Sequence, residues 1–248
     1  MGQLMTGTIF LAGASGVVGR RLVPILVAEG WRVVGMTRSA TKTELLKELG
    51  AFPVVADVFD AIRLQRAFTE ARPDIVIHEL TDLPPRLDPS RMEEATLRNA
   101  RIRDEGTRNL MTAALAGGAR RIVAQSIAFA YAHGPLPHVE EDRLATDADG
   151  RAGTSARGVA SLERQILEAP LEGLVLRYGR LYGPGTGSDA AIGQAPLHVD
   201  AAARAAALAV IRGEPGVYNL AEEDGAVSSE KAKRLLGWSS DWRRNDGL

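Results

Sequence analysis

A glycine-rich segment near the N-terminus constrains this chain more than any other feature. Gly13, Gly16 and Gly19 lie between an apolar run typical of a strand (8–12) and an apolar pattern typical of a helix (17–29). In a strand–turn–helix unit such glycines allow a tight turn, close approach of the backbone to a pyrophosphate, and close packing of the helix on the strand. The helix N-terminus then presents N–H groups and the positive end of its dipole to the phosphates. The segment therefore predicts a dinucleotide site formed by Gly13, Ser15, Gly16, Val17, Val18 and Gly19.

The residues after the second predicted strand indicate which dinucleotide is bound. A protein that holds the adenosine ribose of NAD commonly has Asp or Glu at the end of that strand. Here the strand at 31–37 is followed by Arg38 and Ser39. An arginine fork with a neighbouring hydroxyl suits a 2′-phosphate, which it binds through paired charge-assisted hydrogen bonds. We therefore predict that Arg38 selects NADP(H), with NAD(H) as the alternative.

Strand and helix patterns alternate along most of the chain. Further strands are predicted at 53–56, 74–78, 121–125 and 173–177, and further helices at 41–49, 60–71, 92–117 and 157–168. This alternation predicts an α/β fold, a doubly wound parallel sheet of the Rossmann type. Ligands of such sheets bind beyond the carboxyl ends of the strands, so the loops that follow the strands carry the candidate site.

The pattern changes towards the C-terminus. Turn residues dominate from Tyr182 to Ser188, and the predicted elements after them are an alanine-rich helix (199–211), a short strand (217–220) and a last helix (228–236). We predict a dinucleotide-binding Rossmann domain over residues 1–187. Residues 188–248 form a small C-terminal appendage, a trimmed substrate region packed on that domain.

Composition excludes several classes of function. The 248 residues include 30 Lys and Arg against 31 Asp and Glu, so no large field attracts nucleic acid or an anionic membrane. The absence of cysteine excludes disulfides, thiol catalysis and thiolate metal sites. His133 and His138 stand in a proline-broken segment without metal-ligand spacing, so no metal is predicted. We expect a cytoplasmic protein with a small-molecule substrate and no nucleic-acid or membrane partner, and leave a homodimer open.

With these features the chain resembles the short-chain dehydrogenase/reductase superfamily, in its extended or atypical branch, which includes nucleotide-sugar epimerases and dehydratases. The resemblance rests on the glycine motif, Asp57-Val58, Gly106-Thr107, the segment 176–185 and His198-Val199-Asp200. It implies that Asp57 and Val58 lie beside the adenine ring. It also implies that the loop with Leu80 and Thr81 crosses the cofactor, and that Tyr178 approaches the nicotinamide carboxamide.

The chain departs from this family at the catalytic residues. The family uses a tyrosine as acid and base, a lysine four residues later and a serine or threonine. Alignment on Glu163 places Ser155 at the tyrosine position and Val159 at the lysine position. A serine there is short and weakly acidic, so we predict that Ser155 does not dominate proton transfer.

The loop after the fifth predicted strand offers other hydroxyl groups. Residues 125–131 resemble the family's Ser-Ser-x-x-Val-Tyr-Gly, and we predict Ser126 and Tyr131 as the catalytic residues. Counting back from Tyr131 places Ile127 at the family's hydroxyl position, so Ser126 reaches the site only through a bulge. Arg103 stands where the family commonly has asparagine, and Asn99, one helical turn earlier, could supply the same amide.

Taken together, the sequence predicts an NADP(H)-binding atypical reductase of a small carbonyl or enone, in which NADPH supplies the hydride. Two other classes stay open because the Tyr-x-x-x-Lys pair is absent. One is a redox-neutral isomerase, lyase or cyclase on the same fold. The other is a regulator that senses the cofactor without turnover.

Overall fold

Seven parallel strands form the central sheet of the computed structural model, which describes residues 7–244. The strand order is β3-β2-β1-β4-β5-β6-β9. The strands are β1 (Thr8–Ala12), β2 (Arg32–Thr37), β3 (Phe52–Val55), β4 (Ile75–His78), β5 (Arg121–Ile127), β6 (Glu172–Tyr178) and β9 (Gly216–Leu220). The order reverses between β1 and β4, and this reversal is the switch point at which doubly wound sheets bind ligands. The predicted Rossmann fold is therefore confirmed.

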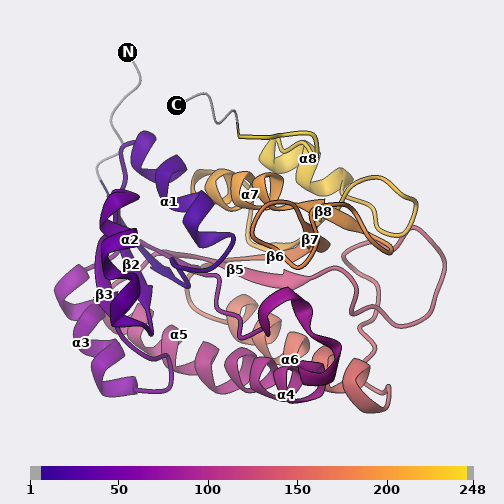
Figure 1. The fold of residues 1–248 in the computed structure, drawn as a ribbon, viewed down its shortest axis with the longest axis horizontal. Coiled ribbons are helices and arrows are strands. Elements are labelled where there is room, and N and C mark those ends of the chain that lie inside the picture. Colours follow the sequence, from indigo (N-terminus) through magenta and orange to yellow (C-terminus); the bar gives the residue numbers. More distant parts are fainter. Residues whose placement is uncertain (1–6, 245–248) are drawn as a thin grey trace.

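Helices cover both faces of the sheet (Figure 1). They are α1 (Gly19–Ala28), α2 (Thr43–Glu48), α3 (Ala61–Ala71), α4 (Met92–Arg101), α5 (Thr107–Ala116), α6 (Gly150–Leu167), α7 (Val199–Ile211) and α8 (Glu230–Leu236). One apolar cluster joins α1, α2, α7 and α8 to one face, and a second joins α3, α5 and α6 to the other. Helix α4 packs along α6 in this second layer.

Two helices differ from the sequence prediction. Helix α6 begins at Gly150 rather than 157, because its first turns bury the small residues Gly153 and Ala156 and so lack an apolar pattern. The predicted helix 92–117 is divided by a π-helical turn, η4 (Ile102–Gly106). A Cβ at Gly106 would lie 3.0 Å from Cγ1 of Val58, so glycine lets the helix approach the loop after β3.

The C-terminal residues share the core of the main sheet. Strand β9 pairs with β6, and α7 packs against α1. Two short strands, β7 (Arg180–Tyr182) and β8 (Pro196–His198), form a separate parallel pair beyond the end of β6. Nδ1 of His198 accepts a hydrogen bond from the Asp200 N–H at 3.2 Å, which caps α7.

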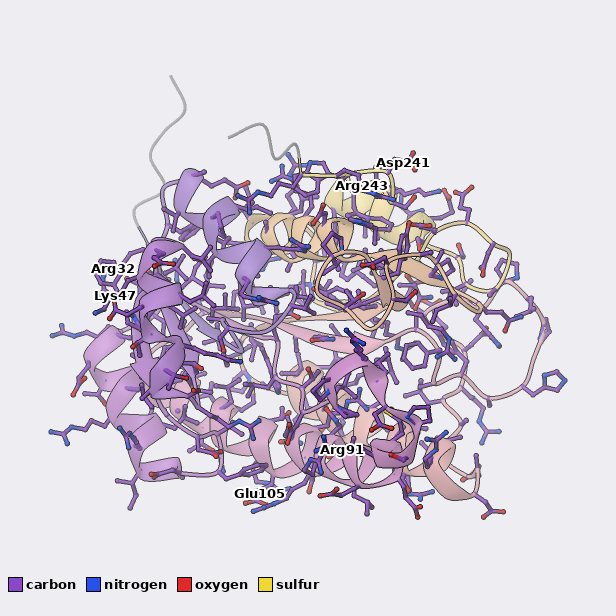
Figure 2. All side chains as sticks on the ribbon, in the orientation of Figure 1. Arg32, Lys47, Arg91, Glu105, Asp241 and Arg243 are labelled. Atoms are coloured by element: carbon purple, nitrogen blue, oxygen red, sulfur yellow. The ribbon has the colours of Figure 1, made fainter. Side chains whose placement is uncertain are left out.

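Charged side chains of both signs lie around the outside of the molecule. Figure 2 shows Arg32 and Lys47 at one edge, Arg91 and Glu105 beside the α4 layer, and Arg243 near the C-terminus. This mixture of signs agrees with a net charge of −1. Across residues 7–244, no helix is both long enough and apolar enough to cross a membrane.

Candidate cofactor and substrate site

The three glycines after β1 have different structural roles. Gly13 has φ +92°, and a Cβ there would lie 2.5 Å from the carbonyl oxygen of Glu79. A Cβ at Gly19 would lie 2.4 Å from the carbonyl oxygen of Gly13, so both positions need glycine for packing. Gly16 is exposed, and a Cβ there would meet only that same oxygen, at 3.1 Å. Gly16 therefore opens the loop to a ligand.

The N-terminus of α1 is suited to an anion. No side-chain hydrogen bond caps the helix and its first turn holds no acidic residue. Val18 is buried in the core and Val17 packs against the same cluster, so these residues offer backbone N–H groups. The Ser15 hydroxyl lies 3.0 Å from the hydroxyl of Thr37 at the end of β2. The loop thus fits a pyrophosphate by both its shape and its dipole.

A hollow at the carboxyl ends of β2, β3 and β4 adjoins the glycine loop. It is lined by Met36, Arg38, Asp57, Val58, Phe59, Leu80, Thr81 and Ile102. Oδ1 of Asp57 accepts a hydrogen bond from the Phe59 N–H at 2.9 Å, and the Val58 carbonyl accepts one from Asn109 at 3.0 Å. The structure thus brings together the residues predicted from the family resemblance to surround the adenosine.

Arg38 is half exposed at the rim of this hollow. Its guanidinium lies 3.3 Å from Asp82, whose carboxylate also pairs with Arg98 at 3.0 Å. The Asn99 side chain holds the Asp82 main chain by donating to its carbonyl and accepting from its N–H, both at 3.0 Å. The Asn99 amide therefore fixes the main chain of this loop, and its equivalence to the family's asparagine stays a prediction.

A buried pair of a tyrosine and a glutamate joins the carboxyl ends of β4 and β6. The Tyr178 hydroxyl donates to Oε1 of Glu79 at 2.8 Å, and the two residues are 1% and 5% exposed. Burial raises the pKa of Glu79 to about 8. Oε2 of Glu79 is buried with no hydrogen-bond partner among residues 7–244. Sequence reasoning missed this pair. The one feature of the sequence that could have indicated it is an acidic residue, Glu79, directly after a buried strand.

His78 precedes Glu79 and is also buried. Nδ1 of His78 accepts a hydrogen bond from the Leu80 N–H at 3.3 Å, so Nε2 carries the proton and donates to the Thr107 hydroxyl at 3.0 Å. Burial, with the nearby charge of Arg103, lowers the pKa of His78 to about 4. This histidine is neutral and satisfied, and it fixes the start of the loop that carries Leu80 and Thr81.

Ser126 and Tyr131 belong to one hydrogen-bond network around Arg177. Ser126 is 1% exposed and donates to Oε1 of Glu163 at 2.8 Å, and Arg177 binds both oxygens of Glu163. The Tyr131 hydroxyl donates to Asn219 at 2.6 Å and accepts from Arg177 at 2.7 Å. Strand β5 pairs with β6 in unbroken register through Ile127, so the bulge that would bring Ser126 to the site is absent. A catalytic role for Ser126 or Tyr131 stays a prediction.

The positions of the family tyrosine and lysine hold no proton donor of that kind. Ser155 accepts a hydrogen bond from Nη1 of Arg103 at 3.2 Å, and Val159 is buried. Burial lowers the pKa of Arg103 to about 10, which leaves it charged at neutral pH. Arg103 stands on the π-helical turn η4, and such turns occur frequently at functional sites. A charged guanidinium thus lies beside Ser155.

A cavity of about 460 Å³ lies beyond the carboxyl ends of β5 and β6. Its lining includes Ala128, Phe129, Tyr131, His133, Leu136, His138, Arg180, Gln194, Ala195, Ala226 and Val227. The exposed guanidinium of Arg180 lies 4.4 Å from the centre of the Phe129 ring. His138 stacks on Tyr131, with 4.7 Å between the ring centres, and also pairs with Asp142. The cavity thus combines aromatic walls with one cation, which suits an aromatic anion.

Comparison with known proteins identifies the family. A model of NAD(P)H-binding proteins matches residues 13–207. A Streptomyces protein named 3-diazoavenalumate denitrifying reductase is 40% identical, over 93% of this chain and 87% of that protein.

Solved structures show the same fold at low sequence identity. The UDP-glucose 4-epimerase of Thermotoga maritima has a TM-score of 0.75 at 20% identity and 93% coverage of both chains. The UDP-N-acetylglucosamine 4-epimerase of Bacillus cereus has a TM-score of 0.73 at 20% identity, covering 95% of this chain and 94% of its own.

The family match and the 40% identical reductase define a nicotinamide-dependent enzyme, and the solved structures show that it has the fold of the nucleotide-sugar epimerases. The chain belongs to the NAD(P)H-binding family and is an oxidoreductase.

Proposed function

We propose that the protein is an NADPH-dependent reductase that replaces the diazo group of an aromatic acid with hydrogen. The observation that carries this proposal is Ser155 at the tyrosine position and Val159 at the lysine position, in a chain 40% identical to a reductase named for a diazo substrate. The proposal rests on matching what this reaction requires to the side chains that line the site.

The reaction needs a hydride but no general acid. When N₂ is displaced from an arenediazonium ion, the C–N bonding pair leaves with N₂, and the hydride brings the pair that forms the new C–H bond. A bound NADPH would supply that hydride, together with both electrons. No alkoxide forms, so no side chain has to deliver a proton. A site without the Tyr–Lys pair is therefore sufficient.

The chain's own residues would orient the substrate and the cofactor. The glycine loop and α1 would hold the pyrophosphate, and Arg38 would bind the 2′-phosphate. In the cavity, Phe129 and Tyr131 would face the aromatic ring, and Arg180 would attract a carboxylate.

Reduction of a small carbonyl or enone is the second candidate. It needs a proton for the developing oxyanion. Tyr131 favours this candidate because it is a phenol that lines the cavity. Its hydroxyl is already bound to Asn219 and Arg177, and burial raises its pKa, so we rank this reaction second.

A substrate panel separates these candidates. NADPH consumption is measured with a carboxylated arenediazonium ion, with an aldehyde and an enone of the same skeleton, and without enzyme. The proposal predicts enzyme-dependent NADPH loss with release of N₂ for the diazonium ion alone. Turnover of only the carbonyl compounds would favour the second candidate. Product formation without NADPH loss would indicate a redox-neutral isomerase or lyase, and nucleotide binding without any turnover would indicate a sensor.

A further inference from the structure

We propose that Glu79 and Tyr178 form a proton-holding pair that senses the charge of the nicotinamide, with Glu79 neutral beside the reduced ring and ionised beside the oxidised ring. This inference rests on the proposed nicotinamide cofactor. It adds a role for a buried carboxyl that the hydride transfer itself does not require.

The first support is the position of the pair. The adenosine hollow lies at the ends of β2, β3 and β4, and the substrate cavity lies beyond β5 and β6. Glu79 and Tyr178 follow β4 and end β6, between these two regions, and the glycine loop packs directly on the Glu79 backbone. A dinucleotide that ran from the hollow across the glycine loop would therefore bring its nicotinamide end towards this pair.

The second support is the incomplete solvation of the carboxyl group. Oε1 of Glu79 accepts one hydrogen bond, from Tyr178, and Oε2 has no partner in the described chain. A buried carboxylate with a single donor is costly, so the neutral acid is favoured, as the pKa of about 8 indicates. A cation placed beside it would reverse that preference. The oxidised nicotinamide ring is a cation and the reduced ring is neutral.

Compared with His78, Arg103 and Tyr178, which keep their protonation states between pH 6 and 9, Glu79 is the group that changes its protonation state. His78 on β4 has a pKa of about 4 and stays neutral between pH 6 and 9. Arg103 on η4 keeps its charge in that range, since its pKa is about 10. Burial holds the pKa of Tyr178 on β6 well above its ordinary value, so its hydroxyl stays protonated. The glycine loop from β1 contributes Ser15, which does not titrate.

The proton balance over a turnover is closed. A hydride, carrying two electrons, passes from the reduced ring to the substrate, and the ring becomes positive. The proton of Glu79 then goes to bulk solvent and returns when reduced nucleotide replaces oxidised nucleotide. The carboxylate left behind stabilises the oxidised ring and so favours hydride donation.

Proton release on binding tests the inference. NADP⁺ and NADPH are titrated calorimetrically into the wild-type protein in buffers of different ionisation enthalpy, at several pH values from 6 to 9. The 2′-phosphate is common to both nucleotides, so its titration cancels in the difference. At pH 7 we expect NADP⁺ to release about one proton more than NADPH, and its relative affinity to rise up to about tenfold per pH unit below pH 8.

Three variants supply the controls. Glu79→Gln is expected to abolish the difference in proton release. Tyr178→Phe removes the hydrogen bond that favours the carboxylate, so the difference is expected to persist with its midpoint at higher pH. Asp82→Asn, which changes a partly buried carboxylate that pairs with Arg38, is expected to leave the difference unchanged.

The outcomes distinguish this inference from the proposed function. Equal proton release by the two nucleotides in the wild-type protein would overturn the inference, as would an unchanged difference in a folded Glu79→Gln variant. If neither nucleotide binds at all, the proposed function fails first.

Discussion

Arg38 lies half exposed beside the adenosine hollow, with its guanidinium 3.3 Å from the carboxylate of Asp82. The residue is flexible enough to turn from that contact towards a ligand, and Asp82 keeps Arg98 as a second partner. An acidic residue at this position would instead repel a 2′-phosphate and bind the ribose of NAD. The proposed preference for NADP(H) therefore rests on one side chain.

We expect Arg38→Ala to weaken NADPH binding roughly ten- to a hundredfold and to leave NADH binding nearly unchanged. The loss of a bidentate arginine–phosphate contact corresponds to on the order of 1.5–3 kcal/mol. Fluorescence titration of both nucleotides measures the change, with Arg91→Ala at an exposed position away from the hollow as the matched control. Equal affinity of the wild-type protein for NADPH and NADH would show that Arg38 does not select the cofactor.

A second residue pair concerns stability. Glu163 and Arg177 are 7% and 5% exposed at their side chains and form a bidentate ion pair between α6 and β6. Glu163→Ala leaves the Arg177 charge buried without its partner. We expect this variant to lower the free energy of unfolding by about 3–5 kcal/mol, measured by urea denaturation.

The double variant Glu163→Ala with Arg177→Met removes both charges and is expected to recover part of that loss. A loss below about 1 kcal/mol for Glu163→Ala alone would mean that the pair does not hold β5, β6 and α6 together.

At the scale of elements, different glycines at the junction of β1 and α1 serve packing and ligand binding. We expect Gly16→Val to abolish NADPH binding while circular dichroism and the melting temperature stay close to wild type, because Gly16 is exposed and a Cβ there would meet only the Gly13 carbonyl oxygen, at 3.1 Å. Gly19→Ala is the contrasting variant. Its Cβ would lie 2.4 Å from the Gly13 carbonyl oxygen, so it should lower stability as well as binding. Unchanged nucleotide affinity in Gly16→Val would refute the phosphate-binding role of this loop.

The elements that sequence reasoning found are those with strong periodic or turn signals. The strands, the glycine loop and α7 follow from apolar runs and turn residues, and α7 spans the predicted residues. The first turns of α6 were missed because they bury glycine and alanine, and β7 and β8 because three-residue strands leave almost no pattern.

The candidate site also has a part that the sequence predicts and a part that it misses. The predicted cofactor residues come from short sequence motifs, and most of them lie in the glycine loop or line one hollow, while their binding role stays a prediction. The Glu79–Tyr178 contact joins residues 99 positions apart, so only the pairing of the sheet brings it together. The direction of the Ser126 side chain depends on the register of β5 with β6, which a motif count does not determine.

At the scale of the whole molecule, the candidate sites follow one edge of the sheet. The adenosine hollow, the glycine loop, the Glu79–Tyr178 pair and the aromatic cavity succeed one another beyond the carboxyl ends of the strands. The helical layers in Figure 1 cover the faces and leave this edge to loops. Under the proposed function, this arrangement would bring a hydride donor and an aromatic acceptor to the same place without requiring a proton donor between them.

The most direct test of this account is to measure where the new hydrogen in the product comes from. The wild-type protein is incubated with a carboxylated arenediazonium ion and NADPH deuterated at nicotinamide C4, on each face in turn, with Gly16→Val as the control. The account predicts that one of the two labelled forms places deuterium on the ring carbon that held nitrogen, with N₂ released in equal amount and no enzyme-dependent product from Gly16→Val. Hydrogen drawn from solvent at that carbon, or equal product with Gly16→Val, would contradict it.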